Sequence, residues 1–560
     1  MNDDEFLVFL EMKKRQYSQR QLSNLTGFSL GKINRIVNLI KKKDEADVTV
    51  NKAIILCAGY GLRMAPANVV PKALIQVKGE ILVERLIKQL HERAINEIYI
   101  VVGFMKEKFE YLIDKYNVKL LCNNEYYNDN NSKSLYMASK YLENAYIIPG
   151  DLYFIDNPFS KYENYSWYML SNYIKDNGYY DVDDKGFLQK GINKFHNVIG
   201  VAYISKKDST NLMKNLETIK KIDRSFWDEA LFINEFKIRT KIVDKSSVFE
   251  INTYENLREI DENSQNLINE HIEIIKQCFK CDLKDIKKIE TLKKGMTNRS
   301  FCFEYEKEKY IVRIPGEGTE CLINRQEEYE VYTKVNALKI CDELVYFNPE
   351  NGVKITKYIK HTRNCDFNKW NDVSLCMKYL KKFHEKKIKV NHEFNLFEQL
   401  DYYEKLFGCV SLYADYKDVK INVLRLKSFI ENFQVTKYLT HIDAVPDNFL
   451  IDTNNRVYLI DWEYAGNQDV HVDIAMFAIY SGYDKNEIDK LINIYFENSC
   501  ADDIRYKIYA YISICGLLWS NWCEYKHKLG VEFGEYSLLQ YRYAKEYSKM
   551  VLDYLEGKNV

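Results

Sequence analysis

The sequence predicts three parts: a small helical segment at residues 1–48, an α/β domain with a mostly parallel sheet at 51–258, and a two-lobed α+β domain at 266–560. Three observations lead to this division. The chain has 560 residues, more than one ordinary domain holds. Strand and helix patterns alternate in the middle part, which indicates a parallel sheet, whereas strands precede helices in the last part. A short stretch with helical periodicity comes before both.

The composition excludes several classes of protein. Only 7 prolines and 22 glycines occur and 46% of the residues are hydrophobic, which excludes collagen-like and largely disordered chains. The 80 Lys and Arg residues nearly balance the 81 Asp and Glu residues, so binding to nucleic acid or to an anionic membrane has to be local. The first residues lack a basic region, and no apolar run approaches the ~18 residues that span a bilayer. We therefore expect a cytoplasmic protein without a membrane segment.

Residues 5–43 contain three apolar stripes at helical spacing, which predict three short helices. Ser18 and Ser29 suit the N-caps of the second and third helices, and Gly27 suits the tight turn between them. Basic side chains lie on or after the third helix, where they could contact DNA phosphates: Lys32, Arg35, Lys41, Lys42 and Lys43. The pattern resembles a helix-turn-helix of the winged-helix regulator type, which implies DNA as a partner. The alternative is a solvated basic helix that mediates dimer or domain contacts.

The middle part starts with an apolar strand at 53–56, which leads through a glycine-bearing loop to an amphipathic helix and then to strand 98–102. This order is typical of a parallel α/β sheet. Glycines after a strand let backbone N–H groups approach a triphosphate, while Arg63 and Lys72 can neutralise the charge that develops as pyrophosphate leaves. The residues that we expect at the nucleotide are Ala58, Gly59, Gly61, Arg63 and Lys72.

A carboxylate is expected near this loop. Asp151 follows the strand at 145–148, and the carboxyl end of such a strand faces the phosphate loop. Mg²⁺ at that position would bridge the triphosphate and an acceptor phosphate.

This set of residues resembles the sugar-phosphate and alcohol-phosphate nucleotidyltransferase family, which implies a Rossmann-like sheet. The stretch 53–257 is similar to bacterial CTP:phosphocholine cytidylyltransferases, and further matching runs lie at 95–98, 102–104, 123–124, 130–131, 134–136 and 226–229. The resemblance implies that CTP binds at the glycine loop and that Asp151 holds the metal. It also implies that the phosphate of phosphocholine attacks the α-phosphorus in line.

The sequence departs from that family at one metal ligand. The family ends with Glu-Ile-Asp, whose Asp is the second metal ligand, whereas this chain reads Glu250-Ile251-Asn252. Asn252 can coordinate Mg²⁺ through its carbonyl oxygen but brings no charge, so metal affinity falls or Glu250 substitutes. Two aromatic residues, Tyr136 and Trp227, either hold a trimethylammonium group or belong to the core.

The last part contains a second constellation. Asp443 lies two residues after His441 and five before Asn448, and two predicted short strands then lead to Asp461. Such a hairpin places Asn448 and Asp461 side by side as Mg²⁺ ligands, while Asp443 can accept the proton of an attacking hydroxyl. The spacing therefore predicts a phosphotransferase.

Upstream, Arg313 lies on a predicted strand where kinases usually carry Lys, and Glu328 is the expected ion-pair partner. The region from about residue 287 to the C-terminus resembles the choline/ethanolamine kinase family, with matching runs at 313–316, 319–320, 323–325, 461–466 and 473–475. That resemblance implies a protein-kinase-like fold, ATP as the phosphoryl donor and Glu463 as a residue that contacts the substrate. Trp519 and Trp522 are read as walls around a quaternary ammonium group, although their helical spacing alone favours core packing.

The two constellations predict consecutive reactions, in which choline is phosphorylated and phosphocholine is then activated to CDP-choline, with Mg²⁺ at both sites. One alternative keeps both folds but has ethanolamine or another amino alcohol for the kinase and a sugar phosphate for the transferase. A second alternative is a transcriptional regulator whose degenerate catalytic domains sense choline or CDP-choline.

Overall fold

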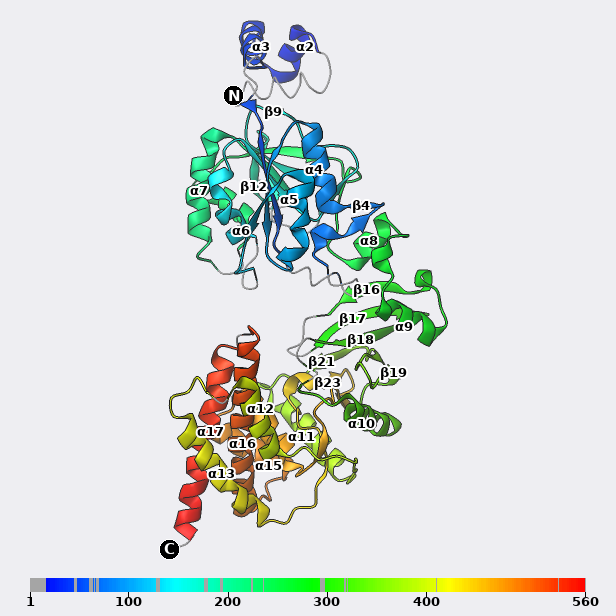
Figure 1. Ribbon diagram of the computed structural model, residues 1–560, viewed down its shortest axis with the longest axis vertical. Helices are drawn as coiled ribbons and strands as arrows, with labels where there is room; N and C mark the ends of the chain where they lie inside the picture. The colour runs from blue at the N-terminus through cyan, green and yellow to red at the C-terminus, as the bar shows by residue number, and fades with distance from the viewer. Residues whose placement is uncertain are drawn as a thin grey trace. The chain divides into compact units, whose positions relative to one another are not determined.

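The computed structural model describes residues 17–44, 48–59, 64, 66, 70–126, 131–175, 180–191, 195–222, 225–234, 236–292, 298–316, 319, 321–408, 410–531 and 533–558. The chain forms two compact units, residues 1–291 and 292–560 (Figure 1). Among the described residues, no helix has both the length and the apolar character that crossing a bilayer requires.

Two helices lie near the start of the first unit: α2 (Gln19–Thr26) and α3 (Leu30–Asp44). Ser18 and Gln21 form a capping box at the start of α2, which ends at Gly27 in the left-handed conformation, φ 71°. Their core consists of Leu22, Ile33, Ile36 and Val37 with Tyr17, Phe28 and Tyr165. Leu25, which belongs to the predicted apolar stripe, is 55% exposed. The first predicted helix lies outside the described residues.

A seven-stranded sheet with the order β14-β10-β13-β7-β2-β5-β6 forms the centre of the first unit. Its strands are β2 (Lys52–Cys57), β5 (Glu97–Val102), β6 (Lys119–Cys122), β7 (Ala145–Pro149), β10 (Trp167–Lys175), β13 (Phe195–Ile204) and β14 (Arg239–Val243). Strand β2 is parallel to β5 and β7, β5 is parallel to β6, and β10 is parallel to β14; only β13 runs antiparallel to its neighbours β7 and β10. This confirms the predicted mostly parallel α/β sheet.

Helices cover both faces of the sheet (Figure 1). One layer contains α4 (Leu82–Glu92) and α5 (Tyr111–Tyr116), and the other contains α6 (Ser132–Met137) and α7 (Lys206–Ile219). Because side chains alternate along a strand, Ala53 and Ile55 of β2 pack in the first layer and Ile54 packs in the second.

Smaller elements complete the first unit. The short strands are β1 (Val48–Thr49), β3 (Gln76–Val77), β4 (Glu80–Ile81), β8 (Leu152–Phe154), β9 (Tyr162–Glu163), β11 (Tyr180–Val182), β12 (Leu188–Lys190), β15 (Val248–Glu250) and β16 (Lys287–Thr291). The last helices are α8 (Tyr254–Ile260) and α9 (Glu270–Phe279).

The second unit begins with strands and continues with helices, as predicted. Its first lobe contains β17 (Asn298–Tyr305), β18 (Glu308–Pro315), β20 (Lys354–Lys357) and β19 (Leu344–Phe347), antiparallel in that order, and α10 (Arg325–Ala337). Its second lobe has short strands β21 (Thr362–Asn364), β22 (Tyr438–Thr440), β23 (Phe449–Asp452), β24 (Val457–Leu459) and β25 (Gly466–Gln468).

Helices form most of the second lobe: α11 (Trp370–His384), α12 (Leu396–Phe407), α13 (Tyr416–Glu431), α14 (His471–Ser481), α15 (Lys485–Tyr495), α16 (Asp502–Lys528) and α17 (Glu535–Lys558). Helix α16 is buried from Lys507 to Lys526 and forms the centre of the lobe. Gly516 is required where α17 crosses it, because a Cβ there would lie 2.7 Å from the carbonyl oxygen of Gln540.

Candidate active sites

The first candidate site lies where two parallel strands of the first unit end. In the register of β2 and β7, Leu56 pairs with Pro149, and the N–H of Gly150 donates to the carbonyl oxygen of Leu56 at 3.0 Å. A Cβ at position 150 would lie 2.4 Å from the Cys57 sulfur. Because only glycine fits this close approach, Gly150 brings Asp151 next to the segment that follows β2.

Three predicted site residues meet here although up to 180 positions separate them. The Lys72 ammonium donates to Asn252 Oδ1 at 2.6 Å and lies 3.6 Å from Asp151 Oδ2. Pairing of β8 with β15 positions the other two residues, since the N–H of Ile251 donates to the Asp151 carbonyl oxygen at 2.9 Å. The site thus combines one cation with a carboxylate and an amide oxygen, and the side chains of Lys72 and Asp151 are 16% and 21% exposed.

The predicted nucleotide loop is described in part. Ala58 is buried, and its carbonyl oxygen accepts from the N–H of Phe104 at 3.2 Å. Gly59 is exposed and a Cβ there would meet no atom within 4 Å. Gly61 and Arg63 lie outside the described residues, so their contacts with a nucleotide stay predictions.

The two aromatic residues predicted for the transferase substrate differ in their surroundings. Trp227 is 1% exposed and packs edge-on against Tyr168 in the core, with ring centroids 5.8 Å apart. Tyr136 is half-buried, and the Lys220 ammonium lies 3.6 Å from its ring centroid. Tyr136 therefore already faces a cation, whereas Trp227 is a core side chain; a substrate role for either stays a prediction.

The second candidate site lies at the β23–β24 hairpin. Phe449 pairs with Leu459, and the N–H of Ile460 donates to the Asn448 carbonyl oxygen at 3.0 Å, which places Asp461 beside Asn448. The amide nitrogen of Asn448 donates to Asp443 Oδ2 at 3.0 Å. Burial raises the pKa of Asp443 well above its usual range, and the nearby Asp461 and Glu463 carboxylates raise it further. The structure therefore brings together the three residues that the spacing predicted.

A residue outside the predicted set holds this loop in place. Ile442 has φ 68°, a costly conformation for a β-branched residue. Asp473 at the start of α14 fixes that turn, because its carboxylate accepts from the N–H of Ile442 at 2.8 Å and from the N–H of His441 at 3.0 Å. The same carboxylate contacts His384 Nε2 at 3.0 Å.

The predicted ion pair between Arg313 and Glu328 is present and buried. The guanidinium contacts both carboxylate oxygens, at 2.6 and 2.8 Å. Arg325 and Lys354 also face Glu328, at 2.8 and 3.5 Å. Burial alone raises the pKa of Glu328, but the cations, Arg313 above all, lower it to about 2. Sequence reasoning assigned no role to Arg325 and Lys354, because nothing in their spacing points to this carboxylate.

Glu463 belongs to the same network. Its Oε2 accepts from Asn298 Nδ2 at 2.9 Å and from Arg313 Nη1 at 3.1 Å, and lies 3.4 Å from Arg325 Nη1. Burial and the Asp461 charge raise its pKa. Glu463 thus connects the loop after β24 with strands β17 and β18, and its predicted contact with a substrate stays a prediction.

Aromatic side chains gather around Tyr464, which lies near Asp443. Trp519 and Trp522 lie one turn apart on α16 and are 6% and 5% exposed, and the rings of Tyr464 and Trp519 are 5.8 Å apart. Burial raises the pKa of the Tyr464 hydroxyl, and the nearby Tyr403, Glu463 and Asp443 raise it further. Tyr403 on α12 belongs to this aromatic group, but the sequence did not point to it. It lies at helical spacing with Leu396, Leu400 and Phe407, a pattern that is typical of a helix face packed in the core.

The residues present fit Mg²⁺ at the hairpin. Within the described ranges, no three His, Cys, Asp or Glu side chains gather in an arrangement that could hold a metal. Mg²⁺ in nucleotide enzymes, however, is typically bound by one or two protein oxygen ligands together with substrate phosphates. Asp461 suits that role, because its buried Oδ1 makes no hydrogen bond and lies 3.5 Å from Arg313 Nη1. In the first unit, Asp151 and Asn252 would supply the corresponding oxygens.

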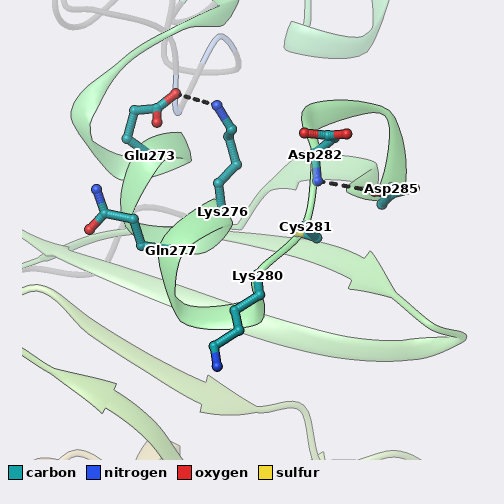
Figure 2. Close-up of a pocket in the computed structure, with 7 residues that line it drawn as sticks. All are labelled: Glu273, Lys276, Gln277, Lys280, Cys281, Asp282 and Asp285. Atoms are coloured by element: carbon teal, nitrogen blue, oxygen red, sulfur yellow. Dashed lines mark hydrogen bonds and ion pairs between the residues drawn. The ribbon is translucent and has the colours of Figure 1, made fainter.

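A separate hollow of about 380 Å³ lies at the C-terminal end of α9 (Figure 2). Both acidic and basic side chains line it, and the Lys276 ammonium forms an ion pair with the Glu273 carboxylate at 2.8 Å. None of the predicted site residues lines it; the lining residues are Glu273, Lys276, Gln277, Lys280, Cys281, Asp282 and Asp285.

Comparisons with known proteins match the two parts separately. The model of the choline/ethanolamine kinase family matches residues 289–523, and that of the MobA-like NTP transferase domain matches residues 53–162, so neither includes α2 and α3. Choline-phosphate cytidylyltransferase of Streptococcus pneumoniae is 33% identical over 228 residues, 38% of this chain and 97% of that enzyme. The 2-aminoethylphosphonate cytidylyltransferase of Lancefieldella rimae is 31% identical over 224 residues, 37% of this chain and 91% of that enzyme. The solved choline kinase LicA from Streptococcus pneumoniae has 29% identity and a TM-score of 0.45, covering 50% of this chain and 100% of that one.

Proposed function

We propose that this chain, which belongs to the MobA-like NTP transferase family through its first unit and to the choline/ethanolamine kinase family through its second, makes CDP-choline from choline in two consecutive steps. The observation that carries the proposal is the buried aromatic group of Tyr403, Tyr464, Trp519 and Trp522, of which Tyr403 and Tyr464 lie near Asp443. Choline carries a cation that cannot donate hydrogen bonds, and aromatic faces attract such a cation through their quadrupoles.

In the kinase step, the aromatic group orients choline with its hydroxyl toward Asp443. Asp443 accepts the hydroxyl proton while the oxygen attacks the γ-phosphorus of ATP. Asn448 and Asp461 would hold Mg²⁺, which when bound neutralises charge on the phosphates. Arg313, held by Glu328, is the expected phosphate contact from β18.

In the transferase step, a phosphate oxygen of phosphocholine attacks the α-phosphorus of CTP and pyrophosphate leaves. Lys72 lies where it can neutralise the developing negative charge, 3.6 Å from Asp151 and hydrogen bonded to Asn252. Asp151 and Asn252 would hold the second Mg²⁺. The predicted contribution of Arg63 comes from the glycine loop.

Mass analysis of products tests the proposal. The purified full chain is incubated with choline, ATP, CTP and Mg²⁺, and we expect both phosphocholine and CDP-choline. Asp443→Asn should block both products, and added phosphocholine should restore CDP-choline. Asp151→Asn should allow phosphocholine to accumulate without CDP-choline. The assignment of the two sites would be contradicted if either variant formed CDP-choline at the normal rate from choline, ATP and CTP without added phosphocholine.

A second substrate class is favoured by one relative, which is named for 2-aminoethylphosphonate, a primary amine. If the first unit prefers such substrates, 2-aminoethylphosphonate or phosphoethanolamine will outcompete phosphocholine in a mixture with CTP. We expect phosphocholine to win. In the kinase, Trp519→Ala should weaken choline binding more than ethanolamine binding, since only the quaternary cation depends wholly on aromatic faces.

A further inference from the structure

The helices α2 and α3 carry a local positive charge that neither proposed reaction uses. Residues 19–44, which form these helices, contain six Lys and Arg residues and a single acidic residue, Asp44, whereas the whole chain has a net charge of -1. The segment also lies outside both family matches. Because basic residues outnumber acidic ones on this small element, it creates a local field that attracts anions.

The two helices pack against each other. Gly27 adopts φ 71° in the turn, which allows α3 to begin three residues later at Leu30, and Ser29 Oγ accepts from the N–H of Lys32 at 3.3 Å. One face of α3 is fixed by burial of Ile33, Ile36 and Val37 against Leu22. A short turn with glycine between two such helices is the arrangement in which the second helix can enter a DNA major groove.

The opposite face of α3 is polar and accessible. Arg35 and Asn38 are exposed, Asn34 is half-exposed, and Arg20 on α2 is exposed as well. Arg and Asn are the side chains that make paired hydrogen bonds to guanine and adenine edges in the major groove. Lys41, Lys42 and Lys43 follow in the last turns of the same helix. The described face thus presents Arg and Asn groups that can contact bases and, in Arg20 and Arg35, cations that can contact phosphates.

We propose that α2 and α3 bind double-stranded DNA, with the exposed face of α3 in the major groove. Duplex DNA suits this surface better than a membrane does, because the accessible residues Asn34, Arg35 and Asn38 of α3 are polar and can form hydrogen bonds to base edges. The packing of Tyr165 against the helix pair ties this element to the transferase unit. The chain would then combine an enzyme with a DNA-binding module.

Fluorescence polarisation with a labelled mixed-sequence duplex of about 30 base pairs tests the proposal on the full chain. We expect binding at about 50 mM salt that weakens steeply toward about 200 mM, as counterion release requires. The double variant Arg20→Glu, Arg35→Glu should bind about tenfold or more weakly and lower the slope of log K against log salt by about two.

A matched control has the same change of charge elsewhere in the first unit. Lys207 and Lys214 are exposed on α7, and the double variant Lys207→Glu, Lys214→Glu should leave DNA binding unchanged. Both double variants should keep the two enzymatic activities, which shows that they fold and separates this test from that of the proposed function.

Three results would overturn the proposal. The wild-type chain could fail to bind the duplex at about 50 mM salt. The control variant could lose as much binding as the variant in α2 and α3. Phosphatidylserine vesicles or a labelled RNA hairpin could be retained more strongly than the duplex, which would assign the surface to a membrane or to RNA instead.

Discussion

The two candidate sites differ in how their charges are arranged. In the kinase site, the buried carboxylates of Glu328 and Glu463 already bind Arg313 and Arg325, so a network that spans both lobes fixes the cations in place. In the described part of the transferase site, Lys72 faces one carboxylate and the neutral Asn252. The kinase site is thus preorganised by buried ion pairs, whereas Lys72 and Asp151 of the transferase site are partly exposed, so that site depends more on the charges that its substrates bring.

The largest expected effect separates the two sites by chemistry. Asp443→Asn should lower kcat for choline phosphorylation by about 10²–10⁴, because the proton acceptor is lost. Transfer of CMP to added phosphocholine should not change, since Asp443 belongs to the other unit. Steady-state assays of each half-reaction measure this. A loss below tenfold would mean that another group accepts the proton.

The second prediction concerns a variant that disrupts the buried ion pairs of the kinase site. Arg313→Met removes the cation that contacts Glu328 and Glu463, and uncompensated buried carboxylates cost about 3–5 kcal/mol of unfolding free energy. Arg325 and Lys354 still face Glu328, so we expect the low end of that range. Denaturant unfolding followed by tryptophan fluorescence measures the change, with Arg313→Lys as the milder control. Equal stability of Arg313→Met and wild type would contradict the arrangement.

A pH series tests the same network without removing its cations. The pKa of Glu328 is about 2 in the folded chain and lies near 4.5 when unperturbed. Because folding lowers this pKa, the ion pairs stabilise the fold fully above pH 4.5 and lose their contribution as the pH falls toward 2. The contribution is about 3 kcal/mol. The variant Glu328→Gln should therefore show a shallower fall of unfolding free energy over this range, and an unchanged slope would exclude the assignment.

The smallest expected effect concerns the transferase site. Asn252→Asp adds a second carboxylate beside Asp151, so the Mg²⁺ concentration for half-maximal transfer should fall by about tenfold, ~1.4 kcal/mol. Titration calorimetry of Mg²⁺ with CTP on the two proteins gives a readout apart from turnover. If the variant needs more Mg²⁺ than wild type, Lys72 and the new carboxylate pair with each other instead.

The spacing of residues along the chain was sufficient to predict much of the two candidate active sites. Asp443, Asn448 and Asp461 are joined by one hairpin, so their distance along the chain nearly fixes their distance in space. Asp151 was predictable because parallel strands end at the same edge of a sheet. In both cases the residues lie on elements that are neighbours in the fold.

Other features depend on contacts between distant elements, which spacing does not encode. Arg325 at the start of α10 and Lys354 on β20 both contact Glu328. Tyr403 occupies a position on α12 that is typical of a residue packed in the core. Trp227 has a residue type suited to a cation pocket, yet it packs in the core against Tyr168. The side chains around it decide between those two environments, and they come from other parts of the chain.

Phosphorus NMR of a single reaction tests the central claim most directly. The wild-type chain is mixed with choline, ATP, CTP and Mg²⁺ and followed in time. We expect a phosphomonoester signal that rises first and then falls as pyrophosphate and a diphosphate diester appear together. A phosphomonoester that accumulates with no pyrophosphate, or CTP and ATP that both stay intact, would contradict a chain that performs both steps.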